Sequence, residues 1–239
     1  MLIDIHAHLH TKDFDQDRDK VLAKCNVKIV EAGVDLESDL RVIELSSRYG
    51  LVPALGFHPE FVERSNEVEE VLKLLDKAKA ISEVGLDYYW VKEEELKREE
   101  VQVLERFLEE GERRNLPVII HSRGGNRDLL SILPSYKVKF VIHAYEGSVN
   151  DALKFVDLGG FISFPPVIVR DKFRQVVAKE VPLENALTET DSPFLGVEKE
   201  TRNEPCNVVY AVKKIAEMKG IDQEEVERKI EENFKKIFP

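Results

Sequence analysis

The chain has 239 residues, of which 43% are hydrophobic and 34% are charged, and its formal net charge is −11. This length can bury the core of one large α/β barrel or of two small domains, and the composition excludes a disordered or fibrous protein. The acidic balance argues against a broad cationic surface for nucleic acid, because such surfaces need many Lys and Arg contacts to phosphates.

Short apolar runs rich in Val and Ile recur along the whole chain and predict strands. Runs buried on both faces are typical of parallel sheets, in which strands alternate with helices. The eight predicted strands cover residues 2–5, 27–33, 51–56, 80–85, 117–120, 139–142, 160–164 and 186–190.

Helical patterns separate these runs. In residues 68–78, apolar side chains recur at i, i+3, i+4 and i+7, as on one face of a helix. Eight such βα units in this length predict a single (β/α)₈ TIM-barrel domain over 1–239, with a doubly wound open sheet as the alternative. The C-terminal residues add one helix, which we expect to begin with a capping box of Asp222 and Glu225 after Gly220 closes the helix before it.

Targeting signals and cysteines indicate the compartment. No run approaches 18 apolar residues, and the N-terminus lacks the pattern of a signal peptide, so we expect a cytoplasmic protein with no membrane partner. Cys25 and Cys206 lie far apart and match no zinc or redox spacing, which favours reduced thiols. Abundant Glu and Lys with few Gln, Met and Cys is a pattern of heat-adapted proteins.

Polar residues follow the predicted strands where each one ends. In the first strand Asp4, His6 and His8 alternate with apolar residues and therefore project from one side. Barrel enzymes place their active sites at the carboxyl ends of the strands. The same placement recurs in the other strands, at His58, Glu83, His121, His143 and Asp191.

These side chains predict a metal centre. A buried carboxylate such as Glu83 must be paired or bound to a cation to offset its desolvation. Imidazoles and carboxylates without thiolates suit Zn²⁺, Mn²⁺, Fe²⁺ or Co²⁺, with Mg²⁺ less natural at imidazole. Six such groups exceed the needs of one ion, and two ions are the arrangement used in phosphoester hydrolysis.

The motifs resemble, in order and spacing, those of the TatD family of metal-dependent hydrolases and deoxyribonucleases. They are DIHAHLH, GFHPE, EVGLDYYW, PVIIHSR, ETDSPFL and RNEPCNV. The resemblance implies a TIM-barrel hydrolase with two divalent ions, Zn, Mn or Mg, acting on DNA or short oligonucleotides. It implies that His6, His8 and Asp191 hold one ion, that His121 and His143 hold the second, and that Glu83 bridges the two.

Two segments depart from the family pattern. HAYEG (143–147) places Glu146 where relatives have a small hydroxyl residue, and a carboxylate there would repel a phosphate. SFPPVIV (163–169) replaces the usual SFSG and so changes the loop that carries Pro165 and Pro166. Both changes bear on substrate binding and leave the predicted ligands intact.

Each remaining candidate has a functional and a structural interpretation. Asp191 either accepts the proton of the attacking water or is only a metal ligand, and His58 either contacts the substrate and donates a proton or packs in its loop. Arg123 and Arg202 are candidate phosphate ligands. In the structural interpretation, Arg123 forms a surface ion pair, and Arg202 belongs to the segment that starts the next helix. Tyr88 and the two aromatic residues after it could stack on nucleic-acid bases. In the structural interpretation, they only line the rim of the barrel.

Three functions remain open from the sequence. The first is a metal-dependent deoxyribonuclease. The second is an amidohydrolase or phosphotriesterase-like hydrolase of a small molecule, and the third is a non-catalytic binding protein that metal stabilises. Comparing the hydrolysis of DNA with that of a panel of amides and esters distinguishes the first function from the second. Any hydrolytic activity excludes the third.

Overall fold

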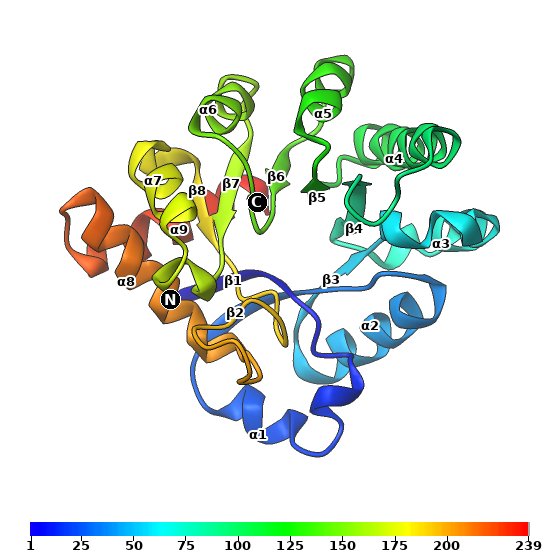
Figure 1. Ribbon diagram of the computed structural model, residues 1–239. Helices are drawn as coiled ribbons and strands as arrows, with labels where there is room; N and C mark the ends of the chain where they lie inside the picture. The colour runs from blue at the N-terminus through cyan, green and yellow to red at the C-terminus, as the bar shows by residue number, and fades with distance from the viewer. Residues whose placement is uncertain (239) are drawn as a thin grey trace. The chain divides into compact units, whose positions relative to one another are not determined.

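The computed structural model describes residues 1–238 and contains eight parallel strands (Figure 1). The strands are β1 (Leu2–Ala7), β2 (Val27–Ala32), β3 (Val52–Leu55), β4 (Ala80–Asp87), β5 (Val118–Arg123), β6 (Phe140–Ile142), β7 (Phe161–Phe164) and β8 (Ala186–Thr188). Their order in the sheet is their order in the chain, without the reversal that defines a doubly wound sheet. The (β/α)₈ prediction is therefore confirmed, and each predicted strand falls on an observed one.

Helices follow the strands as predicted. They are α1 (Arg18–Ala23), α2 (Leu36–Tyr49), α3 (Val68–Lys73), α4 (Glu94–Arg114), α5 (Asn126–Ile132), α6 (Val149–Asp157), α7 (Lys172–Glu180), α8 (Val208–Lys219) and α9 (Gln223–Ile237). The helix expected over 68–78 is shorter, because the backbone tightens into a 3₁₀ turn at Leu75–Lys77. Residues 1–238 include no helix that is both long and apolar enough to cross a membrane.

The chain forms two compact units. The terminal unit comprises Met1–Glu31 and the described residues from His143 onward, and the central unit comprises Ala32–Ile142. Each has an apolar core and carries its own group of polar strand-end residues. A single domain over 1–239 stays a prediction.

In the terminal unit, α9 packs on β1 and β8 and beside α8 (Figure 1). Its apolar stripe is buried, with Val226, Ile230 and Phe234 facing the unit's core. Gly220 ends α8 at φ +65, as predicted. The expected capping box is wrong: within the described residues the Asp222 side chain makes no capping hydrogen bond.

In the central unit, β4 is buried along its whole length and α4 packs against it. Leu104, Phe107 and Leu108 form the buried face of α4, where Gly111 lets the helix approach β5 closely. Strand β4 is thus held rigidly, and it carries Glu83 and Asp87 on one face.

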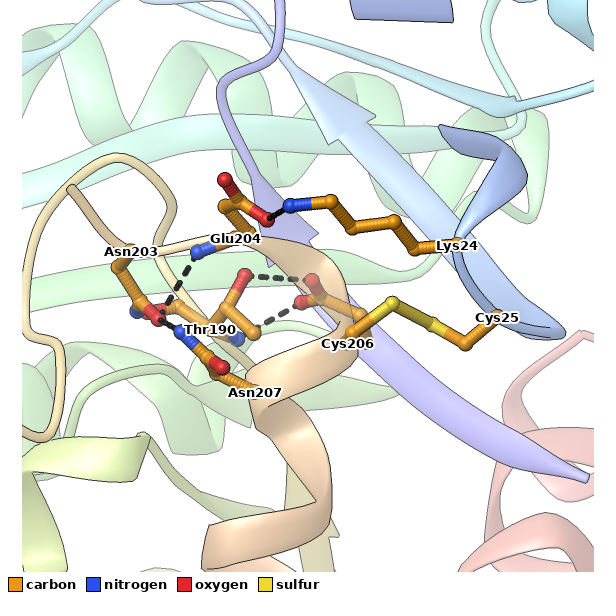
Figure 2. Close-up of a disulfide and its surroundings, with 8 residues drawn as sticks. Lys24, Cys25, Thr190, Asn203, Glu204, Cys206 and Asn207 are labelled. Carbon is orange, nitrogen blue, oxygen red and sulfur yellow. Dashed lines mark hydrogen bonds and ion pairs between the residues drawn. A yellow bond between two sulfur atoms is a disulfide. The ribbon is translucent and has the colours of Figure 1, made fainter. Parts of the chain in front are cut away.

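Cys25 and Cys206 form a disulfide in the terminal unit (Figure 2), so the expectation of reduced thiols is wrong. Their Cα atoms are 5.9 Å apart, although 181 residues separate them in sequence. Cys25 lies just after α1 and Cys206 lies in the 3₁₀ turn before α8. Sequence spacing missed the pair because only the fold brings these two loops together.

Candidate metal-binding site

The terminal unit gathers three imidazoles and one carboxylate. The Nε2 atoms of His6 and His8 are 3.0 Å apart, and they lie 3.5 and 3.2 Å from Oδ1 of Asp191. The His143 ring stacks on His6 with centroids 3.8 Å apart. One ligand atom from each of His6, His143 and Asp191 lies within 4.8 Å of the others. We call these four residues the terminal cluster.

The backbone around β1 and β8 aligns the terminal cluster. The amide of Asp191 donates to the carbonyl of His6, and the amide of His8 donates to the carbonyl of Ser192, both at 2.8 Å. Asp191 has φ +58, which turns the chain sharply after β8. The loop after β8 is therefore fastened to the end of β1.

Asp4, in the core, also fastens the loop after β8 to β1. Its carboxylate accepts hydrogen bonds from the Thr190 amide at 2.8 Å and from the Thr190 hydroxyl at 2.5 Å. Burial raises the pKa of Asp4 well above its ordinary value, although these hydrogen bonds oppose the shift. Asp4 therefore ties β1 to the residue just before Asp191.

Glu189 orients His143. One Glu189 oxygen lies 3.2 Å from Nδ1 of His143, and the other accepts the Ala144 amide at 2.9 Å. Such a carboxylate fixes the tautomer of a metal-binding imidazole and leaves its Nε2 for the ion.

Asp191 is ionised at neutral pH. Removal from water would raise its pKa, but the hydrogen bond with His8 and the charges of His6 and His143 hold the pKa below its ordinary value. A carboxylate in this state can bind a cation and can accept a hydrogen bond from water.

The central unit gathers His58, Glu83 and His121, which we call the central cluster. Oε2 of Glu83 lies 3.3 Å from Nε2 of His58 and 3.0 Å from Nδ1 of His121. The three ligand atoms lie within 4.8 Å of one another. His58 also accepts the Glu60 amide on Nδ1, so its neutral ring carries the proton on Nε2.

Asp87 supports His121 as Glu189 supports His143. Its Oδ2 lies 2.8 Å from Nε2 of His121, and its Oδ1 accepts the amides of Tyr89 and Trp90 at 3.0 Å. Burial would raise the pKa of Asp87, but the bond with His121 and these amides lower it. Glu100 of α4 accepts the Asp87 amide at 2.6 Å.

Two glycines allow the backbone to pass close to Glu83. A Cβ at Gly85, whose φ is +152, would lie 1.8 Å from the carbonyl oxygen of His121. A Cβ at Gly56 would lie 2.6 Å from the carbonyl carbon of Ser82. Both positions require glycine for strands of the central unit to pack at the cluster.

Sequence reasoning missed the carboxylates that support the ligands: Asp4, Asp87, Glu100 and Glu189. Three of them carried a signal at even spacing, since Asp4 precedes His6, Asp87 follows Glu83 and Glu189 precedes Asp191. Glu100 carried none, because a helix residue reaches this position only through the fold.

Arg123 is the last residue of β5, and Tyr88 directly follows β4. The Arg123 guanidinium stacks over the Tyr89 ring with 3.9 Å to its centroid. The Tyr88 hydroxyl donates to Asp128 at 2.6 Å. Tyr89 and Trp90 are 52% and 63% exposed, so the aromatic surface faces solvent.

Arg202 is engaged within the terminal unit. Its guanidinium forms two bonds to Asp17, at 2.8 and 2.7 Å, and a third to Glu204 at 2.8 Å. Glu204 in turn pairs with Lys24 beside the disulfide (Figure 2). The ion-pair interpretation of Arg202 matches these contacts, and its role as a phosphate ligand stays a prediction.

The donor sets of both clusters fit divalent ions. Each combines imidazole nitrogens with a carboxylate oxygen, and all their side chains are buried or nearly so. Oxygen and nitrogen donors of this kind bind borderline cations such as Zn²⁺ and Mn²⁺. The number of ions and their identity remain predictions.

The sequence profile described as TatD related DNase matches residues 3–239. The chain belongs to the TatD-related DNase family. This membership confirms the resemblance found in the motifs and the prediction of a TatD-type metal-dependent hydrolase.

The most similar proteins agree with this membership. Human "Deoxyribonuclease TATDN3" is 38% identical over 100% of this chain and 94% of its own length. A metal-dependent hydrolase of Methanocaldococcus jannaschii is 34% identical over 99% of this chain and 96% of its own length. The crystal structure of the TatD homologue YjjV from Escherichia coli superposes with a TM-score of 0.90 at 26% identity, covering 99% of this chain and 97% of that one.

Proposed function

We propose that this protein is a metal-dependent deoxyribonuclease that hydrolyses phosphodiester bonds in DNA ends or short oligonucleotides. The observation that carries the proposal is the pair of His–carboxylate clusters in a TatD-family chain, each with a supporting carboxylate on an imidazole. The name of the human relative, a deoxyribonuclease, supports DNA as the substrate.

The proposal includes two divalent ions per chain, Zn, Mn or Mg. The family resemblance assigns His6, His8 and Asp191 to one ion and His121 and His143 to the other, with Glu83 shared. Ions held in this way lower the pKa of water and offset the charge on the phosphate oxygens. The ligand set contains no thiolate, in keeping with this range of metals.

Asp191 and His58 have separate roles in the proposed hydrolysis. Water adds to phosphorus while the bond to the leaving oxygen breaks, and its proton passes to Asp191, whose carboxylate is ionised. His58 carries a proton on Nε2, which its Nδ1 contact with the Glu60 amide fixes there. That N–H donates a hydrogen bond to the leaving oxygen, which takes its proton from solvent water, so the ring of His58 stays neutral.

Substrate contacts in the proposal are local, since the net charge is −11. Arg123 offers a guanidinium already held flat on Tyr89, and its N–H groups suit a phosphate. Tyr88, Tyr89 and Trp90 offer ring faces for bases of a single strand.

We also propose that the protein is cytoplasmic, in a heat-adapted cell. Intracellular disulfides are rare in most organisms but common in hyperthermophiles, which reconciles Cys25–Cys206 with this compartment. Alkylation of free thiols in freshly lysed source cells tests the location: labelled Cys25 or Cys206 there would contradict a stable intracellular disulfide.

The decisive experiment is a metal-titrated nuclease assay. Chelator-treated protein is supplied with Zn²⁺, Mn²⁺, Co²⁺ or Mg²⁺ and given single-stranded oligonucleotides, alongside a panel of amides and carboxylic esters. We expect DNA cleavage that Glu83→Gln lowers by about 10³-fold or more, on the scale of losing a principal electrostatic group. Glu109→Gln, at an exposed position of α4, is the matched control. DNA left intact with every ion would overturn the proposal.

A further inference from the structure

A cavity of about 220 Å³ lies between the loop after β6 and the start of α7 in the terminal unit. Its lining comes from Tyr145, Glu146, Gly147, Asp171, Phe173, Arg174 and Val177. Both segments follow the carboxyl ends of their strands, which is also where His143 and Asp191 lie. The cavity therefore opens on the end of the terminal unit that carries its metal ligands.

The cavity is connected to the terminal cluster through Arg174. The Arg174 Nη2 atom donates to the carbonyl of Ala144 at 3.1 Å, and Ala144 directly follows His143. The Ala144 amide in turn donates to Glu189, which orients His143. A residue that lines the cavity thus bonds to the backbone next to His143.

Two features of the lining suit a planar, polar ligand. Phe173 is 85% exposed, an unusual state for a large aromatic side chain in the first turn of a helix. Arg174 is buried, and part of its side chain lines the cavity. A ring face entering the cavity would cover Phe173, and its polar edge would meet the guanidinium of Arg174.

The charge of the lining argues against a phosphate here. Arg174 already pairs with Asp171 at 2.6 Å and Glu146 at 3.3 Å, so two carboxylates accompany one guanidinium. The sequence suggested that Glu146 would repel a phosphate, and the structure leaves this cavity without excess positive charge. A neutral ring with hydrogen-bond donors suits these carboxylates better than an anion.

We propose that this cavity is a subsite for one nucleobase of the DNA strand, stacked on Phe173 with its polar edge toward Glu146 and Arg174. This inference rests on the proposed nuclease function. It identifies where the protein binds a base next to the scissile phosphate. Its volume is below that of drug-sized pockets, which suits one base and excludes a nucleotide pair. Stacking on an aromatic side chain tolerates any base, so the subsite needs no sequence preference.

The test removes the base and the ring separately. Single-stranded oligonucleotides carrying one abasic residue, moved stepwise along the strand, are compared with the unmodified strand. In the unmodified protein, one position beside the cleaved bond should lower kcat/KM by about 5- to 100-fold, the range expected for one stacked base. Phe173→Ala should lower kcat/KM on the unmodified strand by a similar factor and abolish the penalty at that position, and Phe173→Trp should restore both.

Controls separate the subsite from general damage. Tyr210→Ala removes another exposed aromatic, on α8 and outside the cavity lining, and should change nothing. The melting temperature and metal content of Phe173→Ala should match those of the unmodified protein, because the side chain is 85% exposed. A 2-aminopurine base in an uncleavable phosphorothioate strand should lose its fluorescence quenching in Phe173→Ala.

The outcomes are distinct for the two proposals. Cleavage of oligonucleotides with an abasic penalty that persists in Phe173→Ala overturns the subsite and leaves the nuclease proposal standing. Absence of oligonucleotide cleavage by the unmodified protein with every ion overturns the nuclease proposal, and the subsite with it.

Discussion

The two clusters contain the same kinds of ligand, and each has a carboxylate on an imidazole, but Asp4 and Asp87 act in different ways. In the terminal cluster, Asp4 holds the chain around Asp191 from within the core, and burial raises its pKa. In the central cluster, Asp87 contacts the ligand His121 directly, and its pKa is lowered. The first carboxylate therefore maintains the fold of its loop, whereas the second tunes an imidazole.

Alanine at these two carboxylates gives the largest expected contrast. Asp4→Ala leaves the buried Thr190 amide and hydroxyl without their acceptor, so the free energy of unfolding should fall by about 2–5 kcal/mol. Asp87→Ala should cost less stability but lower metal affinity about 10- to 100-fold through His121. Urea denaturation and metal titration of both variants measure the difference; equal losses of stability would remove the distinction.

The disulfide offers a second contrast, because it belongs to the terminal unit alone. Cys25→Ser should lower the free energy of unfolding by about 2–4 kcal/mol, since the bond closes a long loop in the unfolded chain. Reductant should lower the stability of the unmodified protein by a similar amount and leave the variant unchanged. A Tm that responds to reductant equally in both proteins would contradict this account.

Glu100 makes the central unit sensitive to pH. Burial raises its pKa to about 8, whereas the unfolded chain releases that proton near pH 4.5. The folded state thus retains a proton that the unfolded state has lost, and stability falls as pH rises from about 4.5 to 8. Glu100→Gln cannot ionise and should gain roughly 2 kcal/mol over the unmodified protein by pH 9.

The comparison for Glu100 is made on chelator-treated protein, with urea denaturation at pH 4.5, 6, 7.5 and 9. Glu109→Gln, exposed on the same helix, is the control and should follow the unmodified protein. Parallel pH curves for Glu100→Gln and the unmodified protein would show that Glu100 is ionised in the folded state.

The smallest effects concern the two arginines predicted to bind phosphate. Arg123→Ala should raise KM for oligonucleotides about tenfold, the loss of one charge-assisted hydrogen bond. Arg202→Ala breaks the ion pair with Asp17 and should cost at most about 1 kcal/mol of stability with little change in KM. A tenfold rise in KM for Arg202→Ala would restore that residue as a substrate ligand.

Strand positions and ligand candidates could be predicted from the sequence because both follow local rules. An apolar run such as residues 80–85 predicts a buried strand. Polar residues at its end must then lie at the carboxyl edge of the sheet. That edge made His6, Glu83, His121 and Asp191 ligand candidates, and the family resemblance supplied their groupings.

Contacts between distant loops could not be predicted. Cys25 pairs with Cys206, and Arg174 reaches the carbonyl of Ala144, through loop conformations that no periodic pattern encodes. The missing capping bond of Asp222 is a smaller case, in which a residue of the right type begins the helix without using its side chain.

The Cys25–Cys206 bond also constrains how the protein is made. Cys25 leaves the ribosome 181 residues before its partner, which at about 5–20 residues per second is a delay of roughly 10–35 s. Strand β1 must wait through the synthesis of the entire central unit before its neighbour β8 exists. A nascent chain stalled before residue 206 would therefore expose β1 to chaperones, whereas the central unit would already be free to fold.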